Sequence, residues 1–260
     1  VEPFYRRSDP REIPIPDGHE IPGHPARRTR YFVIVALILA IETATKLCSV
    51  AVARAGKLLA IRESDPTTNA HAEKLNVFIE EVIREAGCAL QELDAVAVGI
   101  GPGSYTGLRI GLSAAKGMCY ALDIPVIGLS TLSTLAQGAL EHASERNAEL
   151  WPMVDARRME VFSQPYSAEL EPQQPAAPLI LDQDWAQQPA ARMVFGDGAD
   201  KAAELWNGNE NITFLRGMTP SAKYMFTAAE KRYTAEAFDD LAYLVPDYGK
   251  AANVGMAKKA

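Results

Sequence analysis

The sequence predicts an α/β fold, because short apolar strands are followed by amphipathic helices that alternate with further strands. Three apolar runs, Leu37–Ile41, Cys48–Ala53 and Lys57–Arg62, are separated by turn residues and are typical of an antiparallel meander. A helix, a strand, a second helix, a strand and a third helix are expected to follow. This order is that of one lobe of the actin-like ATPase and sugar-kinase architecture. The chain of 260 residues has room for one large core or for two linked lobes.

The first helix is expected over residues 71–86, where apolar residues repeat on one face of a 3.6-residue period. Asn69 is a suitable N-cap, and Gly87 is a suitable terminator. The residues that form this face are Leu75, Phe78, Ile79, Val82, Ile83 and Ala86.

The next strand, Asp94–Ile100, is uniformly apolar, as a central parallel strand should be. It leads through the loop Gly101–Gly107 (GPGSYTG) into a second helix, Leu108–Leu122. The apolar stripe of this helix consists of Leu108, Leu112, Ala115, Cys119 and Leu122. Beside it, Gly107, Gly111 and Ala114 form a bare face on which another helix could approach closely.

The last two elements of the first lobe are a strand over Val126–Leu129 and a third helix capped by Ser130 and ending near His142. In the second half, Trp151–Ala156 and Met159–Tyr166 indicate a strand pair that turns at Arg157 and Arg158. We expect a surface loop over Pro165–Pro178, a strand at Met193–Phe195, and helical structure within Ser221–Phe238.

The expected domains are a first lobe over residues 35–145 and a smaller second lobe over residues 146–250 with a helix that returns to the first lobe. Residues 1–34 are rich in Pro and Arg and are expected to be a disordered tail or an upstream extension, and residues 251–260 a C-terminal tail. Tyr31–Ile41 resembles the apolar core of a secretory signal, but it leads straight into another strand rather than into a cleavage site. A buried core strand is therefore favoured over a signal.

Composition limits the function. The formal net charge is -7, from 26 Lys and Arg against 33 Asp and Glu. Because a protein that binds nucleic acid through its own surface needs a basic stripe, this charge argues against direct nucleic-acid binding. Without the six Arg and five acidic residues of 1–34 the balance is 20 against 28, a net of -8. The three cysteines, Cys48, Cys88 and Cys119, are widely spaced, which excludes a zinc ribbon or a disulfide framework and suits a reducing cytosol.

The loop GPGSYTG is the strongest local signal, because glycines allow a tight turn and a helix N-terminus presents free N–H groups to an anion. It lacks the Gly-Lys-Ser/Thr of a Walker A loop, and no Asp/His pair is identifiable that would make Ser104 a nucleophile. In actin-like ATPases, acidic and hydroxyl residues surround the phosphates at the turn after the first strand, here Glu42–Thr45. The threonines of this turn serve equally well to satisfy the hairpin backbone. The candidate nucleotide or anion contacts are Glu42, Thr43, Thr45, Gly103, Ser104 and Thr106.

A metal site is not favoured. His71 begins the first helix, and a metal-binding helix would need a second ligand one turn later, where the chain has Leu75. His142 has no recognisable companion ligand. An exposed or capping role is therefore expected for His71.

Several segments together resemble the TsaB (YeaZ) family, glycoprotease-like proteins of bacterial tRNA threonylcarbamoyladenosine synthesis. They are ILAIETATKLCSVAV, GIGPGSYTGLRIGLSAAKGM, PVIGLSTLSTLAQG and VDARRMEVF, within Leu37–Phe162. Near the end, Val245–Tyr248 is similar to a Pro-x-Tyr ending of the family, but Gly249 departs from the bulkier residue expected there.

The resemblance implies a two-lobed actin-like ATPase fold (ASKHA, ribonuclease H-like) without an intact active site. It implies a non-catalytic partner and activator of the enzyme TsaD, with a TsaE-like ATPase as a third component, in the cytoplasm. Together these proteins transfer a threonylcarbamoyl group to the adenosine beside the anticodon of tRNAs that read codons starting with A. The resemblance further implies no cofactor of its own, with ATP and metal on the partner subunits. tRNA would be contacted only through the complex.

In the family, the partner contact is a helix bundle built from the first two helices, and the same surface could form a homodimer when the partner is absent. Carried onto this sequence, the candidate interface residues are His71, Leu75, Phe78, Gly107, Gly111 and Ala114. The alternative is that the apolar residues of both helices face the chain's own sheet, which we expect for Ile79, Val82, Ile83 and Leu112.

Two other functions compete with this interpretation. A glycoprotease-like metallopeptidase would need a metal site. A small-molecule kinase of the same fold would need ATP in the cleft between the lobes and a catalytic acid, for which Asp155 is the candidate.

Overall fold

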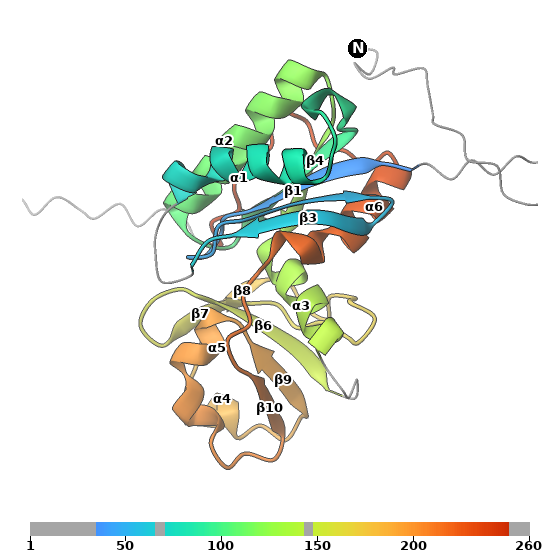
Figure 1. Cartoon of the computed structure of the whole chain (residues 1–260). Coiled ribbons are helices and arrows are strands. Elements are labelled where there is room, and N and C mark those ends of the chain that lie inside the picture. Colours follow the sequence, from blue (N-terminus) through green and yellow to red (C-terminus); the bar gives the residue numbers. More distant parts are fainter. Residues whose placement is uncertain (1–34, 66–70, 143–147, 250–260) are drawn as a thin grey trace, which may run out of the picture.

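A computed structural model describes residues 35–65, 71–142 and 148–249 of the chain (Figure 1). The expected tails, 1–34 and 251–260, and the N-cap Asn69 lie outside the described residues. The expected domain boundaries lie in or beside segments that are not described, so they stay predictions.

The first lobe is built on a five-stranded sheet with the order β3-β2-β1-β4-β5. β1 (Leu37–Glu42) pairs antiparallel with β2 (Ser49–Arg54), and β2 with β3 (Lys57–Glu63), which confirms the meander. β4 (Ala95–Gly101) and β5 (Val126–Ser130) add parallel to β1. Every residue of β1 is buried, as expected for the central strand of a sheet that is covered on both faces.

Helices cover both faces of this sheet (Figure 1). α1 (His71–Glu85) and α2 (Tyr105–Leu122) lie on one face, where Leu37, Leu39 and Ile41 of β1 pack against them. The 3-10 helix η3 (Ala222–Met225) and α6 (Phe226–Thr234) lie on the other face and pack against Ile38 and Ala40. This alternation along β1 places its odd and even residues in two separate cores.

The second lobe has a five-stranded sheet with the order β8-β7-β6-β9-β10, which matches β3-β2-β1-β4-β5 of the first lobe strand by strand. β6 (Glu149–Asp155), β7 (Glu160–Ser163) and β8 (Ala177–Ile180) are antiparallel neighbours, and β9 (Arg192–Phe195) and β10 (Ile212–Leu215) add parallel to β6. The short helices α4 (Gln183–Ala186) and α5 (Asp197–Lys201) and the 3-10 helices η1 (Leu90–Glu92) and η2 (Ala203–Trp206) complete the elements. Two sheets of the same order define the two-lobed actin-like fold that the sequence predicted.

α3 (Thr131–His142) lies between the lobes. Its apolar face packs on the second sheet through Leu132, Leu135 and Ala139, which contact the cluster around Leu150 and Phe195. On another side, Gly138 approaches the ring of Tyr224 so closely that a Cβ at this position would overlap it. α3 therefore joins the second lobe to the layer of η3 and α6 beneath the first sheet.

After α6 the chain returns to the first lobe. Asp239 forms an isolated bridge with Val126 of β5, and its carboxylate accepts hydrogen bonds from the Gly128 N–H (2.6 Å) and from Arg232. Lys116 of α2 donates to the carbonyls of Ala242 and Leu244, both at 3.1 Å. The segment 239–249, which we call the C-terminal segment, thus runs along α2.

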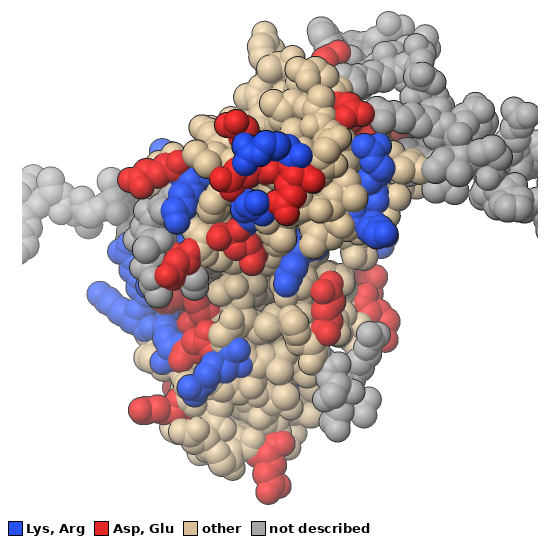
Figure 2. Space-filling view, viewed as in Figure 1, with Lys and Arg blue, Asp and Glu red and all other residues tan. Residues whose placement is uncertain are grey.

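No helix in the described parts of the chain is long and apolar enough to cross a membrane. Figure 2 shows acidic and basic side chains interspersed over the first lobe on the visible face. An example is Arg62, which pairs with Glu81 (2.9 Å) and Glu85 (2.5 Å) of α1. On this face, basic residues are accompanied by acidic ones rather than gathered into a stripe.

Candidate functional site

The loop after β4 starts α2 three residues earlier than the sequence indicated. Ser104 is the N-cap, and its hydroxyl accepts a hydrogen bond from the N–H of Gly107 at 3.2 Å. The Ser104 N–H in turn donates to the carbonyl of Ala44 at 2.6 Å. The loop GPGSYTG is therefore joined to the turn after β1. The structure brings together the two motifs from which the candidate nucleotide contacts were taken.

Glu42 is fully buried at the end of β1. One carboxylate oxygen accepts the Ala44 N–H at 2.7 Å, and the other has no hydrogen-bond partner among the described residues. Gly99 lies beside the carboxylate, where a Cβ would overlap it. Burial raises the pKa of Glu42 to about 7. Glu42 is therefore enclosed by its own fold, and its contact with a nucleotide stays a prediction.

Thr43 is also fully buried, and its hydroxyl donates to the Gly107 carbonyl of α2 at 2.8 Å. The hydroxyl of Thr43 is thus used within the fold, and the nucleotide contact expected for Thr43 also stays a prediction. Thr45 is buried, and its hydroxyl has no hydrogen-bond partner among the described residues. Gly103 lies against Ala44, where a Cβ would overlap the Ala44 carbonyl. Ser104 and Thr106 are exposed. For Thr45, Gly103, Ser104 and Thr106, an anion contact stays a prediction.

Two glycines of α2, Gly107 and Gly111, face inward. A Cβ on Gly107 would overlap the Thr43 carbonyl, and one on Gly111 would overlap the Thr43 hydroxyl. The prediction that these two glycines form a bare face for a partner helix is wrong, because that face is occupied by the chain's own β1–β2 turn. The small residues of α2 that are exposed are Ser113, Gly117 and Ala121.

This packing predicts the effect of a methyl group at position 111. Gly111→Ala is expected to lower the free energy of unfolding by about 2 kcal/mol through its overlap with Thr43. In a Thr43→Ala background the same change is expected to cost less than about 0.5 kcal/mol, because alanine favours the helix and the obstructing hydroxyl is gone. Urea denaturation of the two single variants and the double variant measures this coupling.

Gly117→Ala is the matched control, since no atom lies within 4 Å of the new Cβ. It is expected to stabilise the protein by roughly 0.5 to 1 kcal/mol. An equal cost of Gly111→Ala in both backgrounds would contradict the contact between α2 and the turn.

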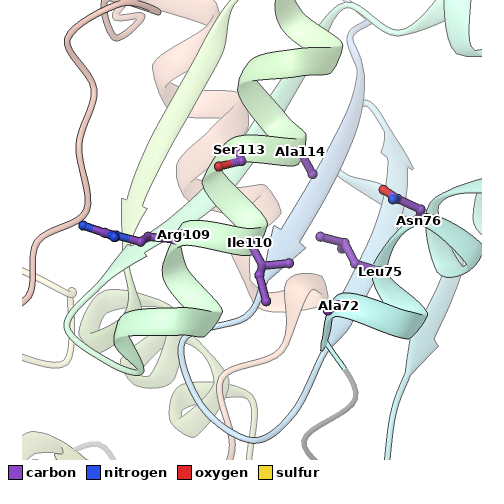
Figure 3. Close-up of a pocket in the computed structure, with 7 residues that line it drawn as sticks. All are labelled: Ala72, Leu75, Asn76, Arg109, Ile110, Ser113 and Ala114. Carbon is purple, nitrogen blue, oxygen red and sulfur yellow. The ribbon is translucent and has the colours of Figure 1, made fainter.

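The outer surface of α1 and α2 carries a groove of about 500 Å³ (Figure 3). Its lining is largely apolar: Ala72, Leu75, Asn76, Arg109, Ile110, Ser113 and Ala114. Of the predicted interface residues, Leu75 and Ala114 line this groove. His71 is buried with its Nε2 unpartnered among the described residues, and Phe78 packs against the core beneath.

The sequence missed Ala72, Asn76, Arg109, Ile110 and Ser113 as lining residues. These residues flank the apolar stripes of the two helices, so the helical periodicity places them near the correct face. The periodicity does not predict how α1 and α2 are rotated relative to one another on the sheet, and this rotation decides which flanking residues line the groove.

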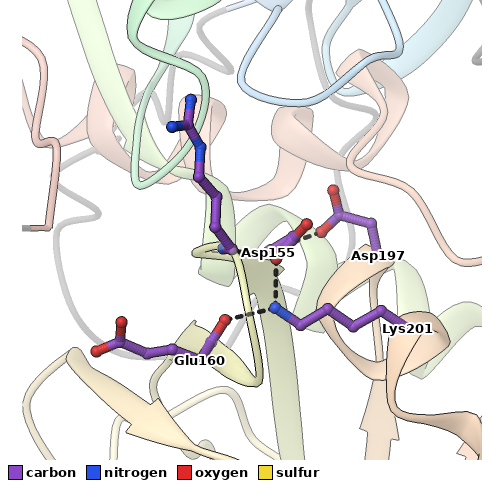
Figure 4. A network of polar contacts seen from close by, with 5 residues as sticks. Asp155, Glu160, Asp197 and Lys201 are labelled. Atoms are coloured by element: carbon purple, nitrogen blue, oxygen red, sulfur yellow. Dashed lines mark hydrogen bonds and ion pairs between the residues drawn. The ribbon is translucent and has the colours of Figure 1, made fainter.

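The second lobe holds a polar cluster at the ends of β6 and β9 (Figure 4). Asp155 forms an ion pair with Lys201, whose ammonium also donates to the Glu160 carbonyl at 2.6 Å. The Asp197 carboxylate accepts the Asp155 N–H at 2.9 Å, and burial raises the pKa of Asp197. Asp155, the candidate acid of a kinase, is thus neutralised by a lysine, and the corresponding acid of the first lobe, Glu42, is enclosed.

Within the described residues, no group of three or more His, Cys, Asp and Glu side chains is placed to hold a metal ion. His71, for which an exposed or capping role was expected, is buried, with 7% of its surface exposed.

A family model, curated proteins and solved structures all relate this chain to proteins of tRNA threonylcarbamoyladenosine biosynthesis or to YeaZ. Residues 65–258 match the family model of TsaD, tRNA N6-adenosine threonylcarbamoyltransferase. The tRNA threonylcarbamoyladenosine biosynthesis protein TsaB of Haemophilus influenzae is 31% identical over 206 residues, which covers 75% of this chain and 86% of that protein. TsaB of Escherichia coli is 38% identical over 125 residues, or 48% of this chain and 52% of that protein. YeaZ from Pseudomonas aeruginosa superposes with a TM-score of 0.70 at 26% identity, over 82% of this chain and 99% of that one.

These matches and the two lobes define a class, the actin-like proteins related to tRNA threonylcarbamoyl transferases. Within that class, the chain belongs to the TsaB (YeaZ) family, which confirms the resemblance carried by its motifs.

Proposed function

We propose that this chain is a non-catalytic subunit in the biosynthesis of threonylcarbamoyladenosine in tRNA, and that it binds and activates a TsaD-like partner. The family membership supports the pathway, because relatives of this chain are named for that biosynthesis. The reaction is the transfer of a threonylcarbamoyl group to the adenosine beside the anticodon of tRNAs that read codons starting with A. ATP and metal belong to the partner subunits.

The observation that supports the non-catalytic role is that the two acidic residues at the ends of β1 and β6 are engaged within the chain's own fold. An actin-like enzyme needs carboxylates that reach the cleft, whereas Glu42 is fully buried and Asp155 is paired with Lys201. What the chain does offer is an exposed apolar groove on α1 and α2. Interfaces gain their affinity from such apolar centres surrounded by polar residues.

The remaining partners follow from the same proposal. A TsaE-like ATPase joins the two subunits, and the groove closes a homodimer when the TsaD-like partner is absent. tRNA is held by the partners. In support, the net charge of this chain is -7, and acidic and basic side chains are mixed on the face shown in Figure 2. The free cysteines Cys48, Cys88 and Cys119 are consistent with a place in the cytoplasm.

Reconstitution of the reaction tests this function. We expect no threonylcarbamoyl transfer to tRNA by the isolated chain, little by the TsaD-like protein with the TsaE-like ATPase, and full transfer when all three are mixed. The modified nucleoside is quantified by mass spectrometry after digestion of the tRNA. Transfer by the isolated chain, or full transfer without it, would refute the proposal.

A further inference from the structure

The C-terminal segment holds Arg109, a residue of the α1–α2 groove, in one orientation. The guanidinium carbon of Arg109 lies 4.1 Å from the ring centroid of Tyr105, one helical turn earlier. The Arg109 Nε donates to the hydroxyl of Tyr248 at 2.9 Å. The two tyrosine rings are in contact, with centroids 4.8 Å apart. Arg109 is therefore positioned by one residue of α2 and one residue of the C-terminal segment.

Backbone contacts fix the C-terminal segment at this place. The Asp247 N–H donates to the Ile100 carbonyl of β4 at 2.7 Å, and the Asp247 side chain accepts the Gly249 N–H at 2.9 Å. Gly101 permits this approach, because a Cβ at that position would overlap the Asp247 carbonyl. Tyr248 is thus anchored to the start of the loop that leads into α2.

Arg109 has no acidic partner among the described residues. α2 contains two cationic residues, Arg109 and Lys116, and no acidic one. Lys116 is engaged by the two carbonyls of the C-terminal segment, whereas Arg109 forms no ion pair with a carboxylate of the described residues. A guanidinium remains charged at all ordinary pH values and binds carboxylates with two parallel hydrogen bonds.

We infer that the segment of the TsaD-like partner that fills the α1–α2 groove presents a carboxylate to Arg109, so that the C-terminal segment is part of the partner-binding surface. This inference rests on the proposed function. An apolar groove with one oriented cation at its border suits a protein helix with an Asp or Glu better than a nucleic acid, which needs several cations along a track. Because Tyr105 and Tyr248 already order the arginine, less entropy is lost when the ion pair forms.

Titration calorimetry of the full chain with the TsaD-like protein tests the inference. Arg109→Gln is expected to raise the Kd at least about tenfold at about 50 mM NaCl, and by a smaller factor at about 500 mM, where ion pairs are screened. Tyr248→Phe keeps the charge and the ring but removes the acceptor, so a rise of roughly threefold is expected. Arg216→Gln is the matched control, since Arg216 also lies over an aromatic ring, Phe214, but in the second lobe; it should leave the Kd unchanged.

Other results would overturn the inference. If wild-type chain binds and Arg109→Gln binds equally well at both salt concentrations, the carboxylate contact is wrong while the proposed function stands. If wild-type chain does not bind the TsaD-like protein at all, both fail. If Arg109→Gln weakens only self-association, measured by sedimentation, the occupant is a second copy. If it weakens only tRNA binding, the arginine serves a phosphate.

Discussion

Glu42→Gln is expected to raise the free energy of unfolding by about 3 kcal/mol at about pH 8, and by less than about 1 kcal/mol at about pH 5. The carboxyl group of Glu42 is fully buried, and its pKa is raised from 4.5 to about 7 by that burial. In the unfolded chain the group ionises near its ordinary pKa. The folded state therefore holds the proton more tightly than the unfolded state between these two values.

The sign of the effect follows from this difference. The contribution of Glu42 to wild-type stability is greatest below about pH 4.5, falls as the pH rises, and levels off once Glu42 is ionised above about pH 7. Glutamine cannot ionise, keeps the oxygen that accepts the Ala44 N–H, and has the same shape beside Gly99. The variant should lack this part of the pH dependence, which urea denaturation at several pH values would show.

Glu80→Gln is the matched control, because Glu80 lies on the exposed side of α1. It should change stability by less than about 0.5 kcal/mol at every pH. If Glu42→Gln destabilised the protein at high pH, the carboxylate would have to serve a bound cation or another positive group, and its assignment as an enclosed, structural acid would be wrong.

Ser113→Arg is expected to raise the Kd for the TsaD-like partner at least about 100-fold. Ser113 is exposed on the outer face of α2 and lines the groove beside Ile110 and Ala114 (Figure 3). An arginine there would fill the groove and bury a charge against the partner's apolar surface. The fold should tolerate the change within about 0.5 kcal/mol, because the side chain points away from the core.

Thr227→Arg provides the control for this experiment. Thr227 is an exposed polar residue of α6, on the opposite face of the first sheet. The Thr227→Arg substitution adds the same charge and size to a helix that the proposed interface does not include. The Kd of this variant for the TsaD-like partner should match that of the wild-type chain, and both Ser113→Arg and Thr227→Arg should have wild-type thermal stability.

The first lobe could be predicted from the sequence because its elements carry strong periodic signals. The strands around Leu39, Val50 and Val96 are uninterrupted apolar runs, and the stripe of Leu108, Leu112 and Ala115 is buried as expected. Several elements of the second lobe were missed. β8 contains a proline and is mostly exposed, with Ile180 at 65%, and β10 is only four residues long, so neither shows the alternation of a half-buried strand.

The candidate site could be predicted only in part. The sequence indicated the correct helices, but it placed Gly107 and Gly111 on the outside. A small residue beside an apolar stripe is equally compatible with an external helix and with a close internal contact, and here the contact is Thr43, distant in sequence. Arg109 gave no signal of its own, because its partner Tyr248 is 139 residues away.

The most direct test of the account is threonylcarbamoyl transfer in the reconstituted system with Ser113→Arg and Thr227→Arg compared at equal concentrations. If the chain acts by docking α1 and α2 on the TsaD-like partner, Ser113→Arg should reduce transfer to the level seen without the chain, and Thr227→Arg should support wild-type transfer. Addition of excess Ser113→Arg should restore part of the transfer in proportion to the complex formed. Full transfer by Ser113→Arg at a concentration where no complex is detected would contradict the central claim.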